Sequence, residues 1–364
     1  MSLAKLSAST FNFYAPRFEV EIESSKLPPD ISKAILDVKV EEVLNGGANC
    51  TLTISEEFDM ETQEFKWLDH DLFEVGNKIT IKMGYGSSLD TMFMGEVSGL
   101  EPSFFAKEAP TITVKGKDLA YDFIKRKSDE KTFVNMSYSD IVQDIAKKAG
   151  LNAKVDKTGK YKGSICKKND ENYFTFIETL AKKAGGFQFS IDGKTLYFVK
   201  PGVEKKELLT LELGKDIISF TPKLNTSNVY AEVEVRGHNP ANPGKPIIGK
   251  ATAGSEQNQE SGKQTASQIA KKKFKAKKKV ITNAKINSVK EANNLAKAEL
   301  DKASACLIEG DVQCVGIPKI RAGVCINLDK MGKRFSGKYY VSATTHTINN
   351  SGYKTNFKVR RNSI

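Results

Sequence analysis

Apolar and polar residues alternate along most of the first 125 positions of the chain. Alternation at a period of two places every second side chain on one face, which is the pattern of a strand with one buried side. Asn45-Gly46-Gly47 lies between two such segments and predicts a hairpin turn. Short strands separated by turns favour a sandwich or a barrel. Strands are expected at residues 18–23, 36–41, 50–54, 78–82, 91–97 and 111–115.

The hydrophobic period becomes helical near residue 128. Ser137 begins a predicted helix with an apolar stripe, and Gly150 ends it. A second helix is predicted from about Asp170, and a strand, a turn and a strand follow it. Residues 128–202 are therefore expected to form a small α+β module.

Alternation returns in the last third of the chain. Residues 239–262 are rich in Pro, Gly, Asn and Gln and predict a long exposed loop. Residues 265–279 are expected to form a basic helix, and Ser288-x-x-Glu291 is a capping box that begins another helix. Residues 203–364 thus form a second β-domain with an insertion at about 239–285. Its strands are expected at residues 209–213, 217–220, 229–235, 324–328, 338–345 and 355–359.

A weak internal repeat relates the two β-rich parts. Gly76, a strand and the triplet Phe93-x-Gly95 resemble Gly323, a strand and the triplet Phe335-x-Gly337. One interpretation is the common reuse of such patterns in β-proteins, and the other is two copies of one β-domain. Duplication predicts that Gly76 superposes on Gly323 and Gly95 on Gly337. The predicted fold is mainly β, with two related barrel-like domains at 1–127 and 203–364 and the α+β module between them.

Composition places the chain among ordinary globular proteins, with 39% hydrophobic and 27% charged residues in 364. No stretch approaches the roughly 18 apolar residues of a membrane helix, so no stable membrane insertion is expected. Residues 1–19 lack the apolar segment of a secretory signal. We therefore expect a chain made in the cytoplasm, with any export by another route or by lysis.

The net charge of +12 is a local feature. Seven lysines lie within nine residues, from Lys271 to Lys279, and the rest of the chain carries only +5. Such a run can contact phosphates or an acidic partner, or it can be a solvated surface segment. Phe274 is its only aromatic residue, so a base-stacking surface is not indicated. We favour a peripheral, solvent-exposed segment over a nucleic-acid partner.

Motifs of catalysis and cofactor binding are missing from the sequence. It contains no phosphate-binding loop, dinucleotide-binding turn, zinc-protease helix or nucleophile elbow. His70, His238 and His346 are scattered, which favours structural roles over catalysis. We assign no catalytic, cofactor-binding or metal-binding residue and expect no enzyme. The cysteines show no zinc or redox spacing and are expected to be buried thiols: Cys50, Cys166, Cys306, Cys314 and Cys325.

Several segments, in order, resemble the phage late control D family, the baseplate hub proteins of contractile tails and related injection particles. The end of the chain is the strongest match, with Gly316-Ile317-Pro318 and then Phe335-Ser336-Gly337-Lys338-Tyr339-Tyr340-Val341. The other similar segments are residues 73–85, 93–97, 138–151, 172–181, 233–240 and 352–355. The resemblance extends over about residues 18–361.

This resemblance implies a homotrimer with two tube-type β-domains per chain. Six similar units would then join a hexameric inner tube to a threefold spike, in contact with other baseplate proteins. VgrG-type relatives continue into further domains, whereas this sequence ends at Ile364 soon after its last predicted strand. The resemblance therefore implies a separate spike protein, in a phage tail baseplate or a released, extracellular injection particle. The alternatives are a VgrG-type spike of a secretion system, a nucleic-acid-binding protein that uses the lysines, and a cell-wall hydrolase.

Overall fold

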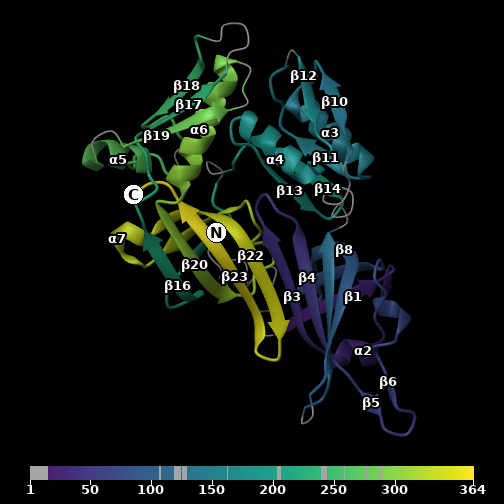
Figure 1. Ribbon diagram of the computed structural model, residues 1–364. Coiled ribbons are helices and arrows are strands. Elements are labelled where there is room, and N and C mark those ends of the chain that lie inside the picture. Colours follow the sequence, from purple (N-terminus) through teal and green to yellow (C-terminus); the bar gives the residue numbers. More distant parts are fainter. Residues whose placement is uncertain are drawn as a thin grey trace.

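One sheet of 13 strands runs through the molecule, and two smaller α/β units stand at one end of it (Figure 1). The computed structural model confirms the prediction of a mainly β fold with α+β insertions. The structure describes residues 15–105, 108–118, 124, 129–161, 163–202, 206–238, 244–257, 259–274, 277–284, 286 and 288–364.

The strands of the large sheet come from two parts of the chain. All the strands predicted before residue 125 are present, because their apolar side chains are buried at alternate positions. The first half contains β1 (Pro16–Ile22), β2 (Ser25–Lys26), α2 (Pro29–Ala34), β3 (Ile35–Val43), β4 (Ala48–Ser55), β7 (Lys78–Tyr85), β8 (Ser88–Ser103) and β9 (Thr111–Asp118). The second half contains β15 (Thr210–Glu212), β16 (Ile217–Leu224), β20 (Ile308–Val315), β21 (Cys325–Asp329), α7 (Gly332–Phe335), β22 (Gly337–Asn349) and β23 (Gly352–Arg361).

The two halves join edge to edge. The strand order is β16-β20-β23-β22-β3-β4-β9-β8-β7-β1-β2, with β21 and β15 on a branch from β22. β22 pairs with β21 through its first residues and with β3 through its last ones. The prediction of barrel-like domains is wrong in this respect: over the described residues the path is open at both ends. In the first half, the outer edge of β3 pairs with β22 instead of closing onto the other end of its own half.

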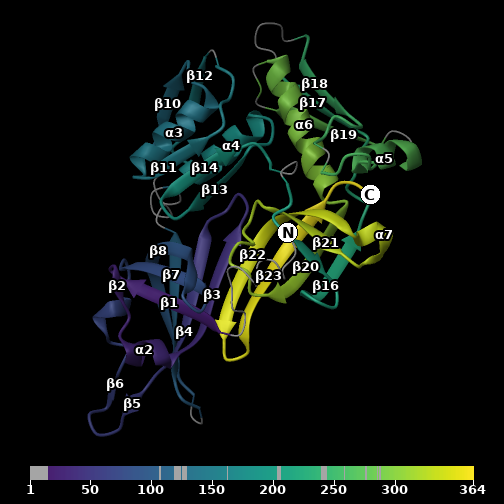
Figure 2. The same ribbon diagram turned by 180° about the vertical axis from the view of Figure 1, so that it is seen from behind.

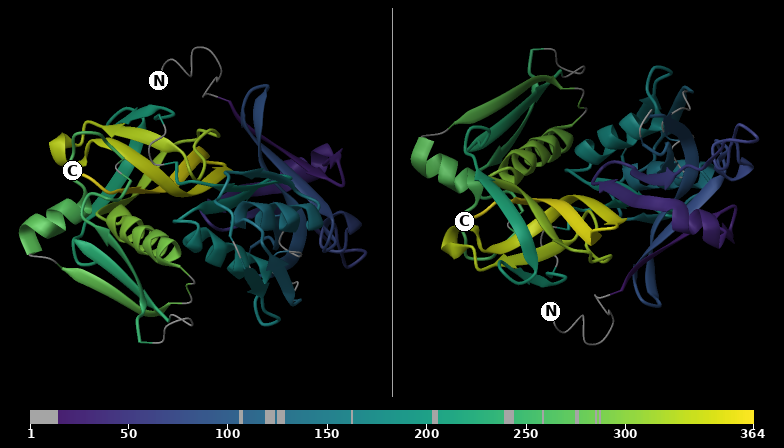
Figure 3. Two further views of the ribbon diagram at one scale, coloured as in Figure 1. Left: turned by 90° about the horizontal axis from the view of Figure 1, so that it is seen from above. Right: turned by 90° about the horizontal axis from the view of Figure 1, so that it is seen from below.

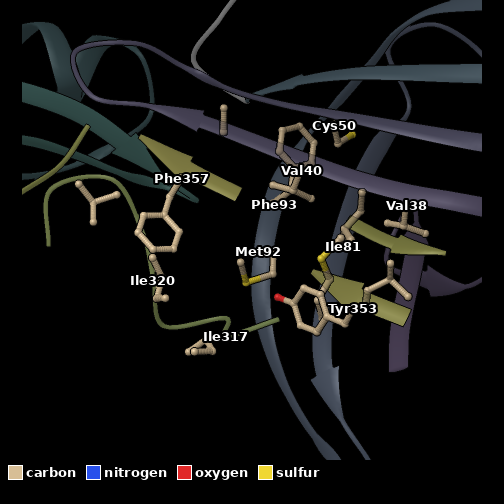
Figure 4. Close-up of a cluster of buried hydrophobic side chains, with 14 of the residues drawn as sticks. Val38, Val40, Cys50, Ile81, Met92, Phe93, Ile317, Ile320, Tyr353 and Phe357 are labelled. Atoms are coloured by element: carbon tan, nitrogen blue, oxygen red, sulfur yellow. The ribbon is translucent and has the colours of Figure 1, made fainter. Parts of the chain in front are cut away.

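Both halves contribute to one hydrophobic core. Val38 and Val40 of β3 and Ile81 of β7 belong to the same buried group as Ile320 and Phe357 of the second half (Figure 4). None of these side chains is more than 3% exposed. Each half therefore covers apolar surface of the other.

The first α/β unit lies between the two halves in the sequence, as predicted. Ser137 caps α3 (Tyr138–Lys148) through a reciprocal capping box with Asp140, and Gly150 has a φ of +70° at its end. Asn172 caps α4 (Tyr173–Lys183), which begins three residues after the predicted start at about Asp170. The helices pack with short strands, of which the sequence predicted only the last two: β10 (Lys131–Val134), β11 (Asn152–Val155), β12 (Ser164–Lys167), β13 (Gln188–Asp192) and β14 (Thr195–Val199).

The second α/β unit is inserted between β16 and β20. It consists of β17 (Glu232–Gly237), β18 (Ile247–Thr252), α5 (Ala266–Phe274), β19 (Lys278–Ala284) and α6 (Val289–Ala305). The prediction of an exposed loop at 239–262 is wrong for β18, which lies within this range. Residues 239–243 and 258 lie outside the described part of the chain. The helix predicted over 265–279 ends at Phe274, because the last lysines enter β19, which pairs in parallel with β17.

The molecule has two unlike ends (Figures 1 and 2). The α/β units occupy one end, with the α+β module over the first half of the sheet and the unit with α6 over the second (Figure 3). At the opposite end, a hairpin of β5 (Phe58–Asp59) and β6 (Glu64–Phe65) projects beyond the sheet, before the short helix η1 (Asp71–Phe73).

Candidate functional site: a duplicated sheet with two open edges

The two halves of the sheet repeat one strand arrangement. β3, β4, β7, β8 and β9 follow one another along the chain and pair in the order β3-β4-β9-β8-β7. β16, β20, β21, β22 and β23 have the same chain order and pair as β16-β20-β23-β22-β21. The outermost strands differ, because β1 pairs antiparallel with β7 whereas β15 pairs parallel with β21. Five strands per half are therefore equivalent.

Gly76 and Gly323 hold the same position in the two halves. Their φ angles are +103° and +90°, a region that favours glycine. The Gly76 N–H donates to the Val97 carbonyl and the Gly323 N–H to the Val341 carbonyl, both at 2.9 Å. Each valine N–H donates back to the carbonyl of the residue after the glycine. This part of the duplication prediction is confirmed.

The predicted equivalence of Gly95 and Gly337 is wrong. Gly95 lies opposite Ile79, whereas Gly337 lies opposite Leu328, two residues further along the equivalent strand. A Cβ at Gly95 would collide with the Lys117 carbonyl oxygen, and one at Gly337 would lie 2.9 Å from the Arg361 guanidinium. Different local contacts therefore require the two glycines, and the Phe-x-Gly triplets match by coincidence.

Two β-bulges recur at equivalent positions. One lies between Ile35 and Asp37 in β3 and between Ile217 and Ser219 in β16. The other follows Val97 in β8 and Val341 in β22. At the second bulge, the Ser98 hydroxyl donates to the Lys115 carbonyl and the Ser342 hydroxyl to the Lys358 carbonyl, both at 3.2 Å. These matches fix which residues of the two halves are equivalent. A residue of β3 is equivalent to the β16 residue whose number is higher by 182. A residue of β22 is equivalent to the β8 residue whose number is lower by 244.

An ion pair holds the joint between the halves. The Arg321 Nε donates to Glu42 Oε2 at 3.0 Å, and its Nη2 donates to Oε1 at 3.3 Å. Arg321 also donates to the carbonyls of Thr91 and Met92, so one side chain connects β3 and β8 with the second half. A bidentate guanidinium–carboxylate pair fixes both distance and orientation.

His346 of β22 is buried at the same joint. Its Nε2 lies 2.9 Å from the Ile320 carbonyl oxygen, which can only accept, so Nε2 carries the proton. Nδ1 is left to accept from the hydroxyls of Tyr353 and Thr355, at 3.0 and 3.1 Å. Burial lowers the pKa of His346 to about 3. The ring is therefore neutral, and its role is structural.

Two edges of the duplicated sheet remain open. Among the described residues, no strand pairs with the outer side of β16 or with the side of residues 99–103 in β8 that faces away from β9. In β3, which is covered by β22, Val38, Val40 and Glu42 are at most 8% exposed. Their equivalents in β16 are Phe220 and Pro222, which are half-buried, and Leu224, which is 39% exposed. β16 thus resembles a β3 that lacks its neighbour.

The lysine run divides into two parts. Lys271, Lys272 and Lys273 are exposed on the last turn of α5, and Lys275 lies outside the described residues. In β19, Lys278 pairs with Glu234 at 2.6 Å, and Lys279 pairs with Glu299 at 2.8 Å. Hydrogen bonds from Lys278, Arg236 and Lys250 lower the pKa of Glu234 to about 2. Part of the basic charge is therefore neutralised within this unit.

The remaining candidate residues form no catalytic group. His70 caps η1 by accepting from the Leu72 N–H, and His238 is exposed. No three His, Cys, Asp or Glu side chains of the described residues could hold a metal ion. Cys50, Cys314 and Cys325 are buried as predicted, Cys306 is half-buried, and Cys166 is exposed, which corrects the prediction for these two thiols. No helix in the described part of the chain is long and apolar enough to cross a membrane.

A cleft of about 270 Å³ lies between the α+β module and α6. Five lysines line it, and its one carboxylate, Glu291, pairs with Lys183 at 2.9 Å. Glu291 also lies 3.5 Å from the Tyr138 hydroxyl, and the Ser288 hydroxyl accepts from its N–H. Its carboxylate is thus used to link the module to α6 instead of completing the predicted capping box.

The chain is similar to several known proteins. A family model described as the Alg8 N-terminal domain matches residues 14–350. No curated protein matches the sequence. The 43 kDa tail protein of prophage MuSo2 from Shewanella oneidensis is similar in structure, with a TM-score of 0.73 at 14% identity; the match covers 95% of this chain and 98% of that one.

Two further solved structures share the fold. A tail protein from Neisseria meningitidis MC58 has a TM-score of 0.69 at 10% identity, over 96% of this chain and 97% of that one. The E. coli c3393 protein has a TM-score of 0.59 at 11% identity, over 94% and 77%. It is described as a component of the type VI secretion system with structural similarity to the T4 bacteriophage tail proteins gp27 and gp5. At such identities the likeness establishes the fold.

Proposed function

The chain belongs to the Alg8 N-terminal domain family, and we propose that it is a structural component of a phage tail or phage-tail-like injection particle. The solved structures that share its fold over most of their length are tail proteins and a secretion-system component, which supports this assignment. We propose further that it is a late-control-D-type baseplate hub and not an enzyme. The observation that carries this proposal is the duplicated sheet with one open edge in each half.

The contact within the chain provides a template for the contact between chains. β22 pairs with β3 so that Ala343 lies opposite Val43 and Thr345 opposite Glu41. The equivalent pairing joins β8 of one copy to β16 of the next. It places Gly99 opposite Asn225 of the partner subunit, and Glu101 opposite the partner's Lys223. Opposite charges directly across two strands stabilise a pairing.

Two prolines restrict the register of this pairing. Pro102 pairs with Ile112 and Pro222 with Gly310, so each proline nitrogen must face the open edge. In the register copied from the β22–β3 pairing, Pro102 lies opposite Pro222 of the partner subunit. The two residues without an N–H group then share one position of the ladder. Another register would leave two positions of the ladder without hydrogen bonds.

The edges are unlike, so the contact is head-to-tail and must close into a ring to avoid a filament. Three copies give six equivalent sheet units, which suits a homotrimer that joins a hexameric inner tube protein to a separate trimeric spike protein. On this proposal residues 1–127 and 203–364 are the two tube-type domains, and 128–202 the module between them. Assembly takes place in the bacterial cytoplasm with other baseplate proteins, before release in a particle. A VgrG-type spike role is the second candidate, supported by the likeness to c3393.

The test is the mass in solution of the chain co-expressed with its spike protein, together with a charge exchange. Wild-type complexes should contain three copies of the 40.1 kDa chain in addition to the spike protein. Glu101→Lys places two cations opposite each other and should shift the population toward monomer, while Glu101→Lys with Lys223→Glu should restore the trimer. A monomer under all conditions, or peptidoglycan clearing by the purified chain in zymography, would contradict the hub. Injection particles that lack this chain would contradict it as well.

A further inference from the structure

The cleft between the α+β module and α6 has an unbalanced charge. Five lysines against one carboxylate, Glu291, give its lining a formal charge of +4. Glu291 pairs with Lys183 at 2.9 Å, and among the described residues no carboxylate pairs with the side chains of the other four lysines. These four, which we call the cleft lysines, are exposed: Lys157, Lys160, Lys200 and Lys290.

The cleft lysines come from both walls of the cleft. Lys157 and Lys160 belong to the module, whereas Lys290 lies in the first turn of α6, which packs beside α4 of the module (Figure 1). The walls approach closely, because a Cβ at Gly159 would lie only 3.7 Å from the Lys290 Nζ. The cation of one wall therefore reaches the lysine-bearing segment of the other. A cleft lined by charges of one sign concentrates ions of the opposite sign.

The lysine-bearing segment of the module is held in place by its own hydrogen bonds. The Thr158 N–H donates to the Ser139 hydroxyl at 3.2 Å, and the Thr158 hydroxyl accepts from the Ser139 N–H at 3.0 Å. Ser139 is only 3% exposed. Lys157 and Lys160 are therefore attached to a backbone that is fixed on the first turn of α3. A preorganised site loses less entropy when its ligand binds.

The chain itself binds one carboxylate on the buried side of the cleft. Glu291 is only 5% exposed, and its Oε1 contacts both the Lys183 Nζ and the Tyr138 hydroxyl, at 2.9 and 3.5 Å. The buried side is thus neutralised, and the excess positive charge lies on the exposed side. An anion that enters from solvent meets this excess charge first.

The size and the lining of the cavity select a compact anion with several charges. Its volume of about 270 Å³ exceeds the need of a single ion, since one water molecule takes about 30 Å³ in the liquid. A DNA duplex is too wide to enter. Tyr138 and Phe187 are at most 8% exposed, and Tyr161 stacks on Tyr138, so charge dominates over base stacking. Lysine ammonium groups bind phosphate groups as point charges.

We propose that this cleft binds a short chain of phosphate groups between the module and α6. The phosphates contact Lys157 and Lys160 on one wall and Lys290 on the other, and so fix the module against α6. The same chemistry occurs in inorganic polyphosphate and in the triphosphate of a nucleotide. The inference does not depend on the hub function, because it concerns the α/β units and leaves the open edges of the sheet unused.

The experiment is isothermal titration calorimetry of the full chain with inorganic triphosphate at physiological salt. One saturable site per chain is expected. Lys157→Gln with Lys160→Gln should weaken binding about tenfold, because two of the four unpaired cations are lost. Lys290→Gln should weaken it from the other wall. The matched control is Lys271→Gln with Lys272→Gln, which removes two exposed lysines from α5, outside the cleft, and should change the affinity by less than about twofold.

Hydrogen exchange tests whether the ligand bridges the two walls. Triphosphate should slow amide exchange in residues 157–161 and in the first turn of α6 together. Protection of one wall alone would contradict the bridge. ATP should bind no more tightly than inorganic triphosphate, and ATP binding tenfold tighter would assign the site to a nucleotide base instead of the phosphate chain.

Three results of the titration overturn the inference. They are the absence of saturable binding by wild type, equal affinity of wild type and the Lys157→Gln, Lys160→Gln variant, and an equal loss of affinity in the α5 control. Without ligand, the cleft variants should resist urea at least as well as wild type, because removing unpaired like charges relieves repulsion. A loss of binding in such a variant is then a loss of the site and not of the fold.

Discussion

His346 shows at the level of one residue how the two halves depend on each other. Burial lowers its pKa to about 3, against about 6.5 for an exposed histidine. Between these values the unfolded chain binds a proton that the folded chain does not. The free energy of unfolding should therefore fall as the pH drops from 6.5 toward 3, by up to about 1.4 kcal/mol per pH unit from this group. Urea unfolding at pH 7, 6 and 5 measures the effect.

The matched variants are His346→Gln and His70→Gln. Glutamine offers a donor and an acceptor at position 346 without a titrating ring, so the variant should lose part of the decline in stability between pH 6.5 and 5. His70 is exposed, and its replacement should leave the decline unchanged. Parallel pH curves for wild type and His346→Gln would refute this account.

Single residues are predictable from the sequence where a local conformational rule is enough. Gly76 and Gly323 were matched because a positive φ next to a strand leaves a glycine in both copies. The sequence pairs Gly95 with Gly337 wrongly, because the contact that requires each glycine lies elsewhere in the sheet. That contact is the Lys117 carbonyl for Gly95 and the Arg361 guanidinium for Gly337. The Arg321–Glu42 pair left no signal, since 279 positions separate its members.

The glycine before each of the equivalent strands β7 and β21 provides a test at the scale of elements. Gly76→Ala and Gly323→Ala should each destabilise the protein by about 1–2 kcal/mol, the cost of a left-handed backbone for a residue with a Cβ. No atom lies within 4 Å of a Cβ at Gly76, and those near Gly323 are at ordinary contact distance, so the cost comes from the backbone alone. Urea unfolding provides the values. Gly159→Ala is the control, because its φ is not positive and its only neighbour is a flexible lysine end at 3.7 Å. Losses under 0.5 kcal/mol at both sites would show that the connections relax.

Helices and strands are predictable from the sequence where one of their faces is buried. They are not predictable where pairing with a distant strand determines the conformation. Alternation located β3, β4 and β7 because their buried side chains follow a period of two. β19 was missed because its first residues are lysines, which read as an exposed helix. They form a strand because β17 places Glu232 opposite Lys278 and Glu234 beside it. That pairing spans more than 40 residues, so no local window contains it.

At the scale of the whole molecule, the duplication was indicated by the sequence, whereas the open edges required strand registers. Only the matched bulges reveal that Glu101 and Lys223 occupy the positions of Thr345 and Glu41. The barrel interpretation failed for the same reason: alternation predicts a buried face but does not say which edge remains open.

The net charge of +12 leads to the last prediction, which concerns binding of DNA by the whole molecule. Lys278 and Lys279 are engaged by Glu234 and Glu299, and Lys277 donates to the Ser227 carbonyl, so the described part of the lysine run offers three exposed cations without such contacts, Lys271 to Lys273. Three phosphate contacts give a log–log salt slope of only about −3, at about −0.9 per contact. Binding should therefore be weak, non-specific and lost near physiological salt, as measured by fluorescence anisotropy with duplex DNA. Replacing these three lysines with glutamine should remove the residual binding, while Lys278→Gln with Lys279→Gln should change it little. Tight binding at physiological salt that disappears in the triple variant would instead make DNA a partner of this surface.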